Sequence, residues 1–196
     1  MREVELKAVV PDLDASRAAL VAAGAVRTYA GRLEDRRYDT PARGLAGRDH
    51  VLRLRVYRGA PVRATLDWKG PTGYADGYKV REELTTPLGD PEALAAMLER
   101  IGCVVTREID REIEQYDLGG TTVRFERYPR MDVLVEVEGE PAGIERAIAA
   151  LGLPRASFTT ERLPDFVRRY EARTGTRAAI CDRELTGDYR YATADA

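Results

Sequence analysis

The stretch EVELKAV at residues 3–9 decides the fold, because charged and aliphatic residues alternate along it without a break. Successive side chains of a β-strand point to opposite faces of the sheet. Glu3, Glu5 and Lys7 therefore share one face, and the aliphatic residues between them share the other. The stretch predicts a strand with one apolar face and one charged face.

The same alternation returns along the rest of the chain. Further segments of this kind are LRLRV at 52–56, LDWK at 66–69, YKVREEL at 78–84, VRFE at 123–126 and LVEVE at 134–138. An antiparallel sheet with one solvated face is one interpretation of this pattern. Like charges recur two residues apart, however, as Glu-x-Glu and Arg-x-Arg, and they repel one another on a shared face. This clustering favours a sheet closed into a barrel, whose charged interior binds divalent cations and a polyanion.

Four segments predict helices that would cover the apolar outside of such a barrel. They are residues 14–23, 91–101, 142–151 and 164–174, and a glycine, a typical helix-ending residue, follows each of them. A strand that leads into a short helix ending at glycine occurs at 3–24, 81–102 and 135–152. We therefore expect an α+β fold with one domain over residues 1–175. The tail at 176–196 is expected to form an extra strand or a flexible end.

The composition excludes several classes of protein. Lys plus Arg number 31 and Asp plus Glu 33 among 196 residues, a formal net charge of −2, whereas a non-specific nucleic-acid binder is strongly basic. Two cysteines and one histidine are too few for a disulfide framework, a zinc finger or most Cys/His nucleophiles. Because no signal-peptide or membrane-spanning pattern is present, we expect a soluble, cytoplasmic protein that binds neither nucleic acid nor membrane.

Short motifs occur along the chain in a fixed order. They are Glu3-x-Glu5-x-Lys7, YDTP at 38–41 followed by LRLR at 52–55, WKGP at 68–71, Arg81-x-Glu83 and LVEVEG at 134–139. Their order and spacing resemble the CYTH domain, also called the triphosphate tunnel metalloenzyme superfamily. The resemblance implies an eight-stranded antiparallel closed β-barrel with helices packed outside. Its tunnel would bind a triphosphate and one or two divalent metal ions.

The resemblance also implies roles for individual residues. The metal ligands would be the carboxylates of Glu3, Glu5, Glu126, Glu136 and Glu138, although the family usually has Asp where this chain has Glu126. The phosphate ligands would be Lys7, Arg53, Arg55, Lys69, Arg81 and Arg111, with Arg107 as an alternative to the last. The catalytic residues would be Glu83, Lys7 and Arg55, with Glu83 or a metal-binding glutamate orienting the water.

Two departures from the family pattern bear on function. Some members use a lysine near the C-terminus, where this chain offers only Arg168, Arg169 or Arg173. Members that make cyclic AMP from ATP tend to carry a His-Phe element before the first strand. In this chain only Met1 and Arg2 precede that strand, which disfavours the cyclase.

We therefore expect a hydrolase, dependent on Mg²⁺ or Mn²⁺, that cleaves inorganic triphosphate, thiamine triphosphate or a nucleoside triphosphate. A class IV-type adenylate cyclase is the alternative, and a non-catalytic sensor of polyphosphate or nucleotide is a third reading. The expected partner is a small-molecule triphosphate, and a homodimer is compatible with the family.

Overall fold

The computed structural model describes residues 2–59, 61–189 and 191. Its strands are β1 (Arg2–Val9), β2 (Val26–Asp39), β3 (Val51–Tyr57), β4 (Arg63–Lys69), β5 (Gly73–Ala75), β6 (Tyr78–Leu88), β7 (Val104–Leu118), β8 (Thr121–Arg127) and β9 (Leu134–Glu138). Its helices are α1 (Leu13–Ala22), α2 (Pro91–Arg100), α3 (Pro141–Leu151), α4 (Leu163–Thr174) and α5 (Asp182–Thr186), with the 3-10 turns η1 (Ala46–Arg48) and η2 (Arg155–Ser157). The four predicted helices therefore form within one residue of their expected bounds.

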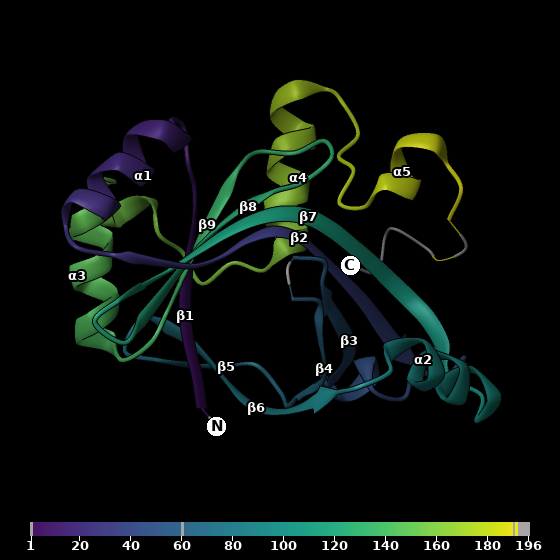
Figure 1. Cartoon of the computed structure of the whole chain (residues 1–196). Coiled ribbons are helices and arrows are strands. Elements are labelled where there is room, and N and C mark those ends of the chain that lie inside the picture. The colour runs from purple at the N-terminus through teal and green to yellow at the C-terminus, as the bar shows by residue number, and fades with distance from the viewer. Residues whose placement is uncertain (1, 60, 190, 192–196) are drawn as a thin grey trace.

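The sheet closes on itself. Within the described residues the strand order is β1-β9-β8-β7-β2-β3-β4-β6, and β6 pairs back onto β1. Every pairing is antiparallel, and the short β5 adds to β6 as an extra strand. The predicted eight-stranded antiparallel barrel is confirmed. In Figure 1 the long β2 and β7, which pair along most of their length, cross the picture side by side.

The charged face of the sheet points into the barrel. Residues directly opposite each other in the register lie on the same face of the sheet. Glu136 of β9 stands opposite Lys7 of β1 on one side and opposite Arg124 of β8 on the other. Glu5 stands opposite Glu138 in the same way. These side chains line an internal cavity, so the solvated-sheet interpretation is wrong for this chain.

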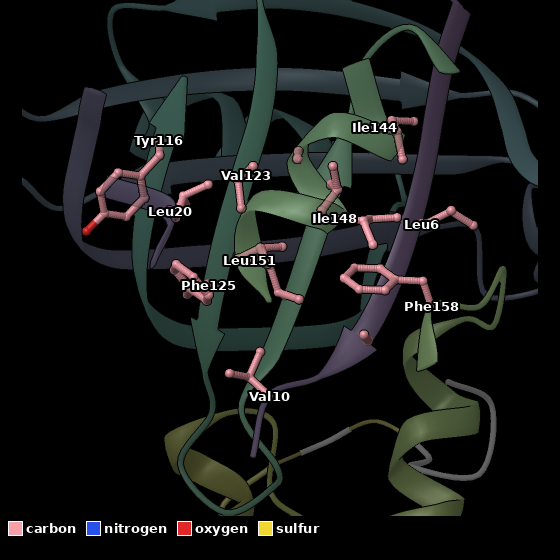
Figure 2. Close-up of a cluster of buried hydrophobic side chains, with 14 of the residues drawn as sticks. Leu6, Val10, Leu20, Tyr116, Val123, Phe125, Ile144, Ile148, Leu151 and Phe158 are labelled. Atoms are coloured by element: carbon pink, nitrogen blue, oxygen red, sulfur yellow. The ribbon is translucent and has the colours of Figure 1, made fainter. Parts of the chain in front are cut away.

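A hydrophobic core holds helices α1 and α3 against the outside of β1, β8 and β9. Leu6, Val123 and Phe125 point outward from these strands and meet Ile144 and Leu151 of α3 (Figure 2). Each of these side chains is almost completely buried. Full burial of one such side chain stabilises a fold by about 1.5–3 kcal/mol, so this cluster fixes the strands that carry the acidic motifs.

The remaining helices cover other parts of the barrel. Helix α2 lies at the lower right of Figure 1, and its Leu98 packs on Tyr38 and Leu54. Phe166 of α4 packs on Leu134 and Ile109, which brings the start of α4 to one end of the barrel. No helix in the described ranges is long and apolar enough to cross a membrane.

The segment after α4 continues across the barrel. Ala179 pairs with Arg130 in an isolated bridge, and the amide of Asp110 donates to the carbonyl of Ile180. The domain boundary at residue 175 stays a prediction. Of the predicted tail 176–196, residues 190 and 192–196 lie outside the described residues.

Strands β2 and β7 do not show the alternation that predicts the other barrel strands. Their outward faces carry charge as well, because Arg36 of β2 donates to Asp110 of β7 and is also paired with Glu108. Because both faces of these strands carry charged residues, charged and apolar residues do not alternate along their sequence. The two longest strands were therefore missed by the periodicity.

Candidate functional site

The barrel encloses two adjoining cavities. The first has a volume of about 310 Å³ and reaches Leu163 and Pro164 at the start of α4; we call it the α4-side cavity. The second has a volume of about 550 Å³ and is lined by Tyr57 and Leu84 at the other end; we call it the Tyr57-side cavity. Their linings share Arg53, Arg55 and Lys69, so together they form one charged tunnel.

One wall of the tunnel is acidic. Its carboxylates belong to β1 and β9 and are those of Glu3, Glu5, Glu136 and Glu138. All three lysines of the sequence reach this wall: Lys7 donates to Glu5 (Nζ–Oε1 3.1 Å) and Glu136, Lys79 donates to Glu5, and Lys69 donates to Glu3. The three lysines therefore converge on the acidic wall from three different strands.

The carboxylates of this wall are more crowded than the lysines can satisfy. Burial and the neighbouring charges of Glu136 and Glu3 raise the pKa of Glu138 to about 7. Within the described residues, Oε2 of Glu3 is buried and receives no hydrogen bond. Glu5 and Glu138 are like charges placed directly opposite each other, an arrangement that is unfavourable without a cation.

This donor set suits a hard divalent cation, which prefers carboxylate oxygens. In the part of the chain that is described, no three His, Cys, Asp or Glu side chains are yet gathered around one point as metal ligands. Glu3 and Glu5 are instead paired with lysines, Glu3 with Lys69 and Glu5 with Lys7 and Lys79. Metal binding would require the lysines to release these carboxylates.

The opposite wall is basic and is held by two aspartates, Asp35 and Asp67, to which the sequence pattern assigns no role in the site. Asp35 accepts from Arg55 (Nε–Oδ1 2.8 Å) and from Arg111 (Nη1–Oδ2 3.0 Å). Burial would raise the pKa of Asp35, but Arg55, Arg111 and Arg53 hold it well below its usual value. Asp67 accepts from Arg53 through Nε at 2.9 Å and Nη2 at 2.7 Å. The strand parity of Asp67 with Lys69 was the available signal; Asp35 lies in a strand without a visible period.

Arg111 and Arg107, the two predicted alternatives on β7, lie in different surroundings. Arg111 lines the α4-side cavity and donates to Glu126 (Nε–Oε1 2.9 Å). Arg107 lies near Glu184 (Nη1–Oε1 3.5 Å) and lines a different pocket, beside α4. Of these two arginines, Arg111 is therefore the one that lines a tunnel cavity, and its role as a phosphate ligand stays a prediction.

Glu126 is enclosed by donors. Besides Arg111, it accepts from Arg124 (Nε–Oε1 3.2 Å) and from the hydroxyl of Tyr128 (2.7 Å). Burial opposes ionisation, yet Arg111 and Arg124 lower its pKa to about 2. This carboxylate orients the two arginines, and its predicted role as a metal ligand stays a prediction.

Glu83 lies where the two cavities meet. It accepts from Arg53 (Nη2–Oε1 3.2 Å) and is paired with Lys69 (Nζ–Oε2 3.2 Å). It lines the Tyr57-side cavity beside the predicted phosphate ligands. The predicted catalytic set of Glu83, Lys7 and Arg55 is thus brought to the same tunnel, on three different strands.

The α4 end of the tunnel is basic as well. Arg81 donates to the carbonyls of Gly70 (2.7 Å) and Asp49 (2.6 Å), and Arg162 donates to the carboxylate of Asp49 (3.2 Å). Arg162 stands just before α4 and was missed by the sequence analysis. The three predicted alternatives do not line either tunnel cavity among the described residues: these are Arg168, Arg169 and Arg173.

A closed antiparallel barrel with a tunnel of facing carboxylates and cations defines a triphosphate-tunnel architecture. Residues 1–145 match the CYTH domain, and the chain belongs to this family. Enzymes of the superfamily act on triphosphates and generally depend on a divalent metal ion. No curated protein matches the chain.

Solved structures share the fold at low sequence identity. A candidate adenylate cyclase from Vibrio parahaemolyticus is 22% identical with a TM-score of 0.72, covering 85% of this chain and 97% of that one. A candidate adenylyl cyclase from Hippeastrum, described as having a dominant triphosphatase activity, is 17% identical with a TM-score of 0.61, covering 89% and 96%. A chain of the Schizosaccharomyces pombe Mediator head module is 16% identical with a TM-score of 0.59, covering 78% and 92%. At these identities the likeness establishes the fold alone.

Proposed function

We propose that this protein is a divalent-metal-dependent triphosphatase that cleaves the terminal phosphoryl group of a triphosphate inside the barrel. The observation that carries the proposal is the division of the tunnel into a crowded carboxylate wall and a facing wall of lysine and arginine. A triphosphate bears about four negative charges near neutral pH. When it leaves bulk water for the barrel interior, cationic side chains and a metal ion can balance that charge. A carboxylate wall would repel it unless a cation lay between them.

The metal would be Mg²⁺ or Mn²⁺, and Glu3, Glu5, Glu136 and Glu138 would hold it. Such an ion supplies charge neutralisation at phosphate oxygens and lowers the pKa of a bound water. The crowding around Glu138 supports this assignment, because burial and Glu136 raise its pKa in the absence of a cation. The lysines that now neutralise the wall would be released to the phosphate chain.

The phosphate chain would be held by Lys7, Arg53, Arg55, Lys69, Arg81 and Arg111. Asp35 fixes Arg55 and Arg111 in place through buried hydrogen bonds, so these guanidiniums need little reorganisation when substrate binds. Arginine presents a planar fork that matches two phosphate oxygens, whereas each lysine acts as a point charge. The arginines would therefore position the phosphate oxygens, and the lysines would mainly balance their charge.

Glu83 would orient the attacking water, since it lies beside Lys69 and Arg53 in the lining of the tunnel. The water oxygen forms a bond to the terminal phosphorus, and the bond from that phosphorus to the bridging oxygen breaks. The bridging oxygen leaves with the electron pair, and the water proton passes to Glu83 and then to solvent. The products are orthophosphate and the shortened phosphate compound.

An adenylate cyclase is the second candidate, because the Vibrio parahaemolyticus protein with the same fold is described as a candidate cyclase. In that reaction the 3′-hydroxyl of ATP attacks the α-phosphorus and pyrophosphate leaves. The same cations would hold the leaving group. The two activities therefore differ in which phosphorus lies in line with the nucleophile.

The deciding experiment supplies the purified chain with inorganic triphosphate, thiamine triphosphate or ATP, each with Mg²⁺, Mn²⁺ or a chelator. We expect metal-dependent release of orthophosphate from at least one substrate. Glu5→Gln should lower that rate by about 100-fold or more while the far-ultraviolet circular dichroism is unchanged. Cyclic AMP and pyrophosphate from ATP would establish the cyclase instead, and binding without turnover would establish a sensor.

A further inference from the structure

A groove with a volume of about 950 Å³ lies outside the barrel, between α2 and the segment that contains α5; we call it the α2–α5 groove. Its floor includes Leu54 and Val56 of β3, which alternate with residues that line the tunnel and therefore face outward. Helices α2 and α5 both lie on the right of Figure 1. Within the described residues, the groove shares no lining residue with either tunnel cavity, so it is separate from the proposed substrate site.

The floor of the groove is apolar. Leu54 and Tyr38 belong to the cluster that holds α2 against the barrel, and they are almost fully buried, as is Val56. Cavities of this size that combine an apolar lining with a few polar groups are typical of sites for small organic molecules. The floor therefore suits the hydrocarbon part of such a ligand.

The charged groups around this floor are mostly acidic. The carboxylates that line the groove are those of Glu34, Glu92, Glu99, Glu108 and Asp188, and the guanidiniums are those of Arg36, Arg58 and Arg183. Each guanidinium already has a carboxylate partner: Arg36 and Arg183 pair with Glu108, and Arg58 pairs with Glu34. In the described ranges, neither Glu99 nor Asp188 forms an ion pair. The groove therefore keeps a surplus of negative charge.

Glu108 of β7 is the lining residue whose hydrogen bonding is incomplete. Its Oε1 lies 3.2 Å from Nε of Arg36 and 3.3 Å from Nη1 of Arg183. The residue is only 6% exposed, and no donor in the described part of the chain reaches its buried Oε2. A buried carboxylate oxygen without a donor costs free energy, and an N–H group of a ligand would supply the missing partner.

The acids of α2 indicate a ligand with more than one positive charge. Glu92 and Glu99 both line the groove and are seven residues apart, which is about 10 Å along the helix axis. Burial and the charge of Glu99 raise the pKa of Tyr38, so this carboxylate acts on the floor of the groove. A single inorganic cation would reach one of these acids and would leave the apolar floor uncovered.

We propose that the α2–α5 groove binds a linear aliphatic polyamine. One ammonium group donates to Glu108, another lies beside the acids of α2, and the methylene chain between them covers Leu54 and Val56. This class of ligand matches the apolar floor, the spaced carboxylates and the missing donor together. The inference goes beyond the proposed function and does not depend on hydrolysis of a triphosphate in the tunnel.

Isothermal titration calorimetry of the purified full chain with spermidine tests the site. The titration is made without phosphate and at about 0.15 M salt, where attraction between exposed charges is largely screened. We expect saturable binding of a single spermidine, weaker binding of the shorter diamine putrescine, and no binding of the neutral 1,4-butanediol. Absence of saturable spermidine binding, or equal binding of the diol, would overturn the proposal.

Two variants remove charge from the groove. Glu108→Gln should weaken spermidine binding by about 10- to 100-fold, because a buried charged acceptor is lost. Since Glu108 also pairs with two arginines, the unfolding temperature of this variant is measured alongside. Glu99→Lys changes an exposed residue, so it should leave the unfolding temperature unchanged and weaken binding about fivefold or more. Wild-type affinity in both variants would overturn the proposal.

Two matched controls test where spermidine binds. Glu112→Gln changes an exposed acid of β7 that does not line the groove, and Glu5→Gln changes the acidic wall of the tunnel. Both should bind spermidine as wild type does. If either weakens binding as much as Glu108→Gln does, the ligand is held by the general acidic surface or by the tunnel, and the groove is not its site. If the wild type binds spermidine in the groove but hydrolyses no triphosphate, the proposed function fails and this inference stands.

Discussion

At the scale of single residues, the tunnel is a set of charges whose protonation is fixed by their neighbours. Asp35 is almost fully buried and is kept ionised by three arginines, whereas burial and neighbouring carboxylates raise the pKa of Glu138. The two acids differ because one faces cations and the other faces carboxylates. A bound cation would therefore stabilise the ionised form of Glu138 more than that of Asp35, which arginines already stabilise.

Asp35→Asn should destabilise the fold by about 3–5 kcal/mol at pH 7, because it leaves Arg55 and Arg111 buried beside a neutral amide. The pKa of Asp35 is lower in the folded than in the unfolded chain, so its contribution is complete above about pH 4 and is lost as pH falls further. The stability difference from wild type should therefore shrink below about pH 4. Urea unfolding at pH 7 and near pH 3 measures it.

Asp14→Asn supplies the control, since this aspartate is exposed on α1 and pairs only across one helical turn with Arg17 and with no buried arginine in the described structure. Its effect should stay within about 0.5 kcal/mol at either pH. If Asp35→Asn lowered the free energy of unfolding no more than Asp14→Asn does, the buried arginines would not depend on the Asp35 carboxylate.

At the scale of elements, the helices fix the tunnel from outside by close contact with the strands. Gly143 in α3 lies against Thr121 at the start of β8, and Thr121 is buried. A Cβ built on Gly143 would come within 2.2 Å of Oγ1 of Thr121. Glycine is therefore required here by the distance between helix and strand, and the strand concerned carries Arg124 and Glu126.

Gly143→Ala should destabilise the fold by about 1–3 kcal/mol, because α3 must move away from β8 to admit the methyl group. The double variant Gly143→Ala/Thr121→Ala should recover part of that loss, since the clashing hydroxyl is gone. Gly89→Ala is the control, because nothing lies within 4 Å of its added Cβ. Chemical denaturation of the three variants and wild type measures these differences; equal behaviour of Gly143→Ala and Gly89→Ala would contradict the packing argument.

At the scale of the whole molecule, the barrel buries a wall of carboxylates and a facing wall of lysines and arginines. The outside is held by ordinary apolar packing of helices on strands. The net charge of −2 averages over these walls and conceals them. Stability should consequently depend strongly on ligands that enter the tunnel.

Mn²⁺ or Mg²⁺ together with inorganic triphosphate should stabilise the wild-type chain by about 2.7 kcal/mol at 100 times the dissociation constant, and a chelator should remove the part due to metal. Glu138→Gln should lose the part of the stabilisation that is due to metal but keep the response to triphosphate alone. The reason is that the Glu138 carboxylate lies among other carboxylates and would bind the metal ion rather than phosphate. Thermal unfolding with each ligand separately and combined measures this. An unchanged metal response in Glu138→Gln would refute the assignment of that carboxylate.

The sequence could predict the closed barrel and the acidic wall, because charge on one strand face leaves a period of two in Glu3-x-Glu5 and Glu136-x-Glu138. It could not predict β2 and β7, whose two faces are both charged. Asp35 and Arg162 were missed for a related reason. Their significance lies in which residues stand opposite them in the register or across the tunnel mouth, and a linear pattern does not contain that relation.

The lysines have one further consequence. All three lysine side chains of the sequence lie in the tunnel with exposures of only 11–12%, so the outer surface draws its positive charge from arginine. Reagents and modifying enzymes that target side-chain amines would therefore meet them only through the openings of the tunnel. If the tunnel binds phosphate as proposed, acylation of a lysine and binding of phosphate would exclude each other.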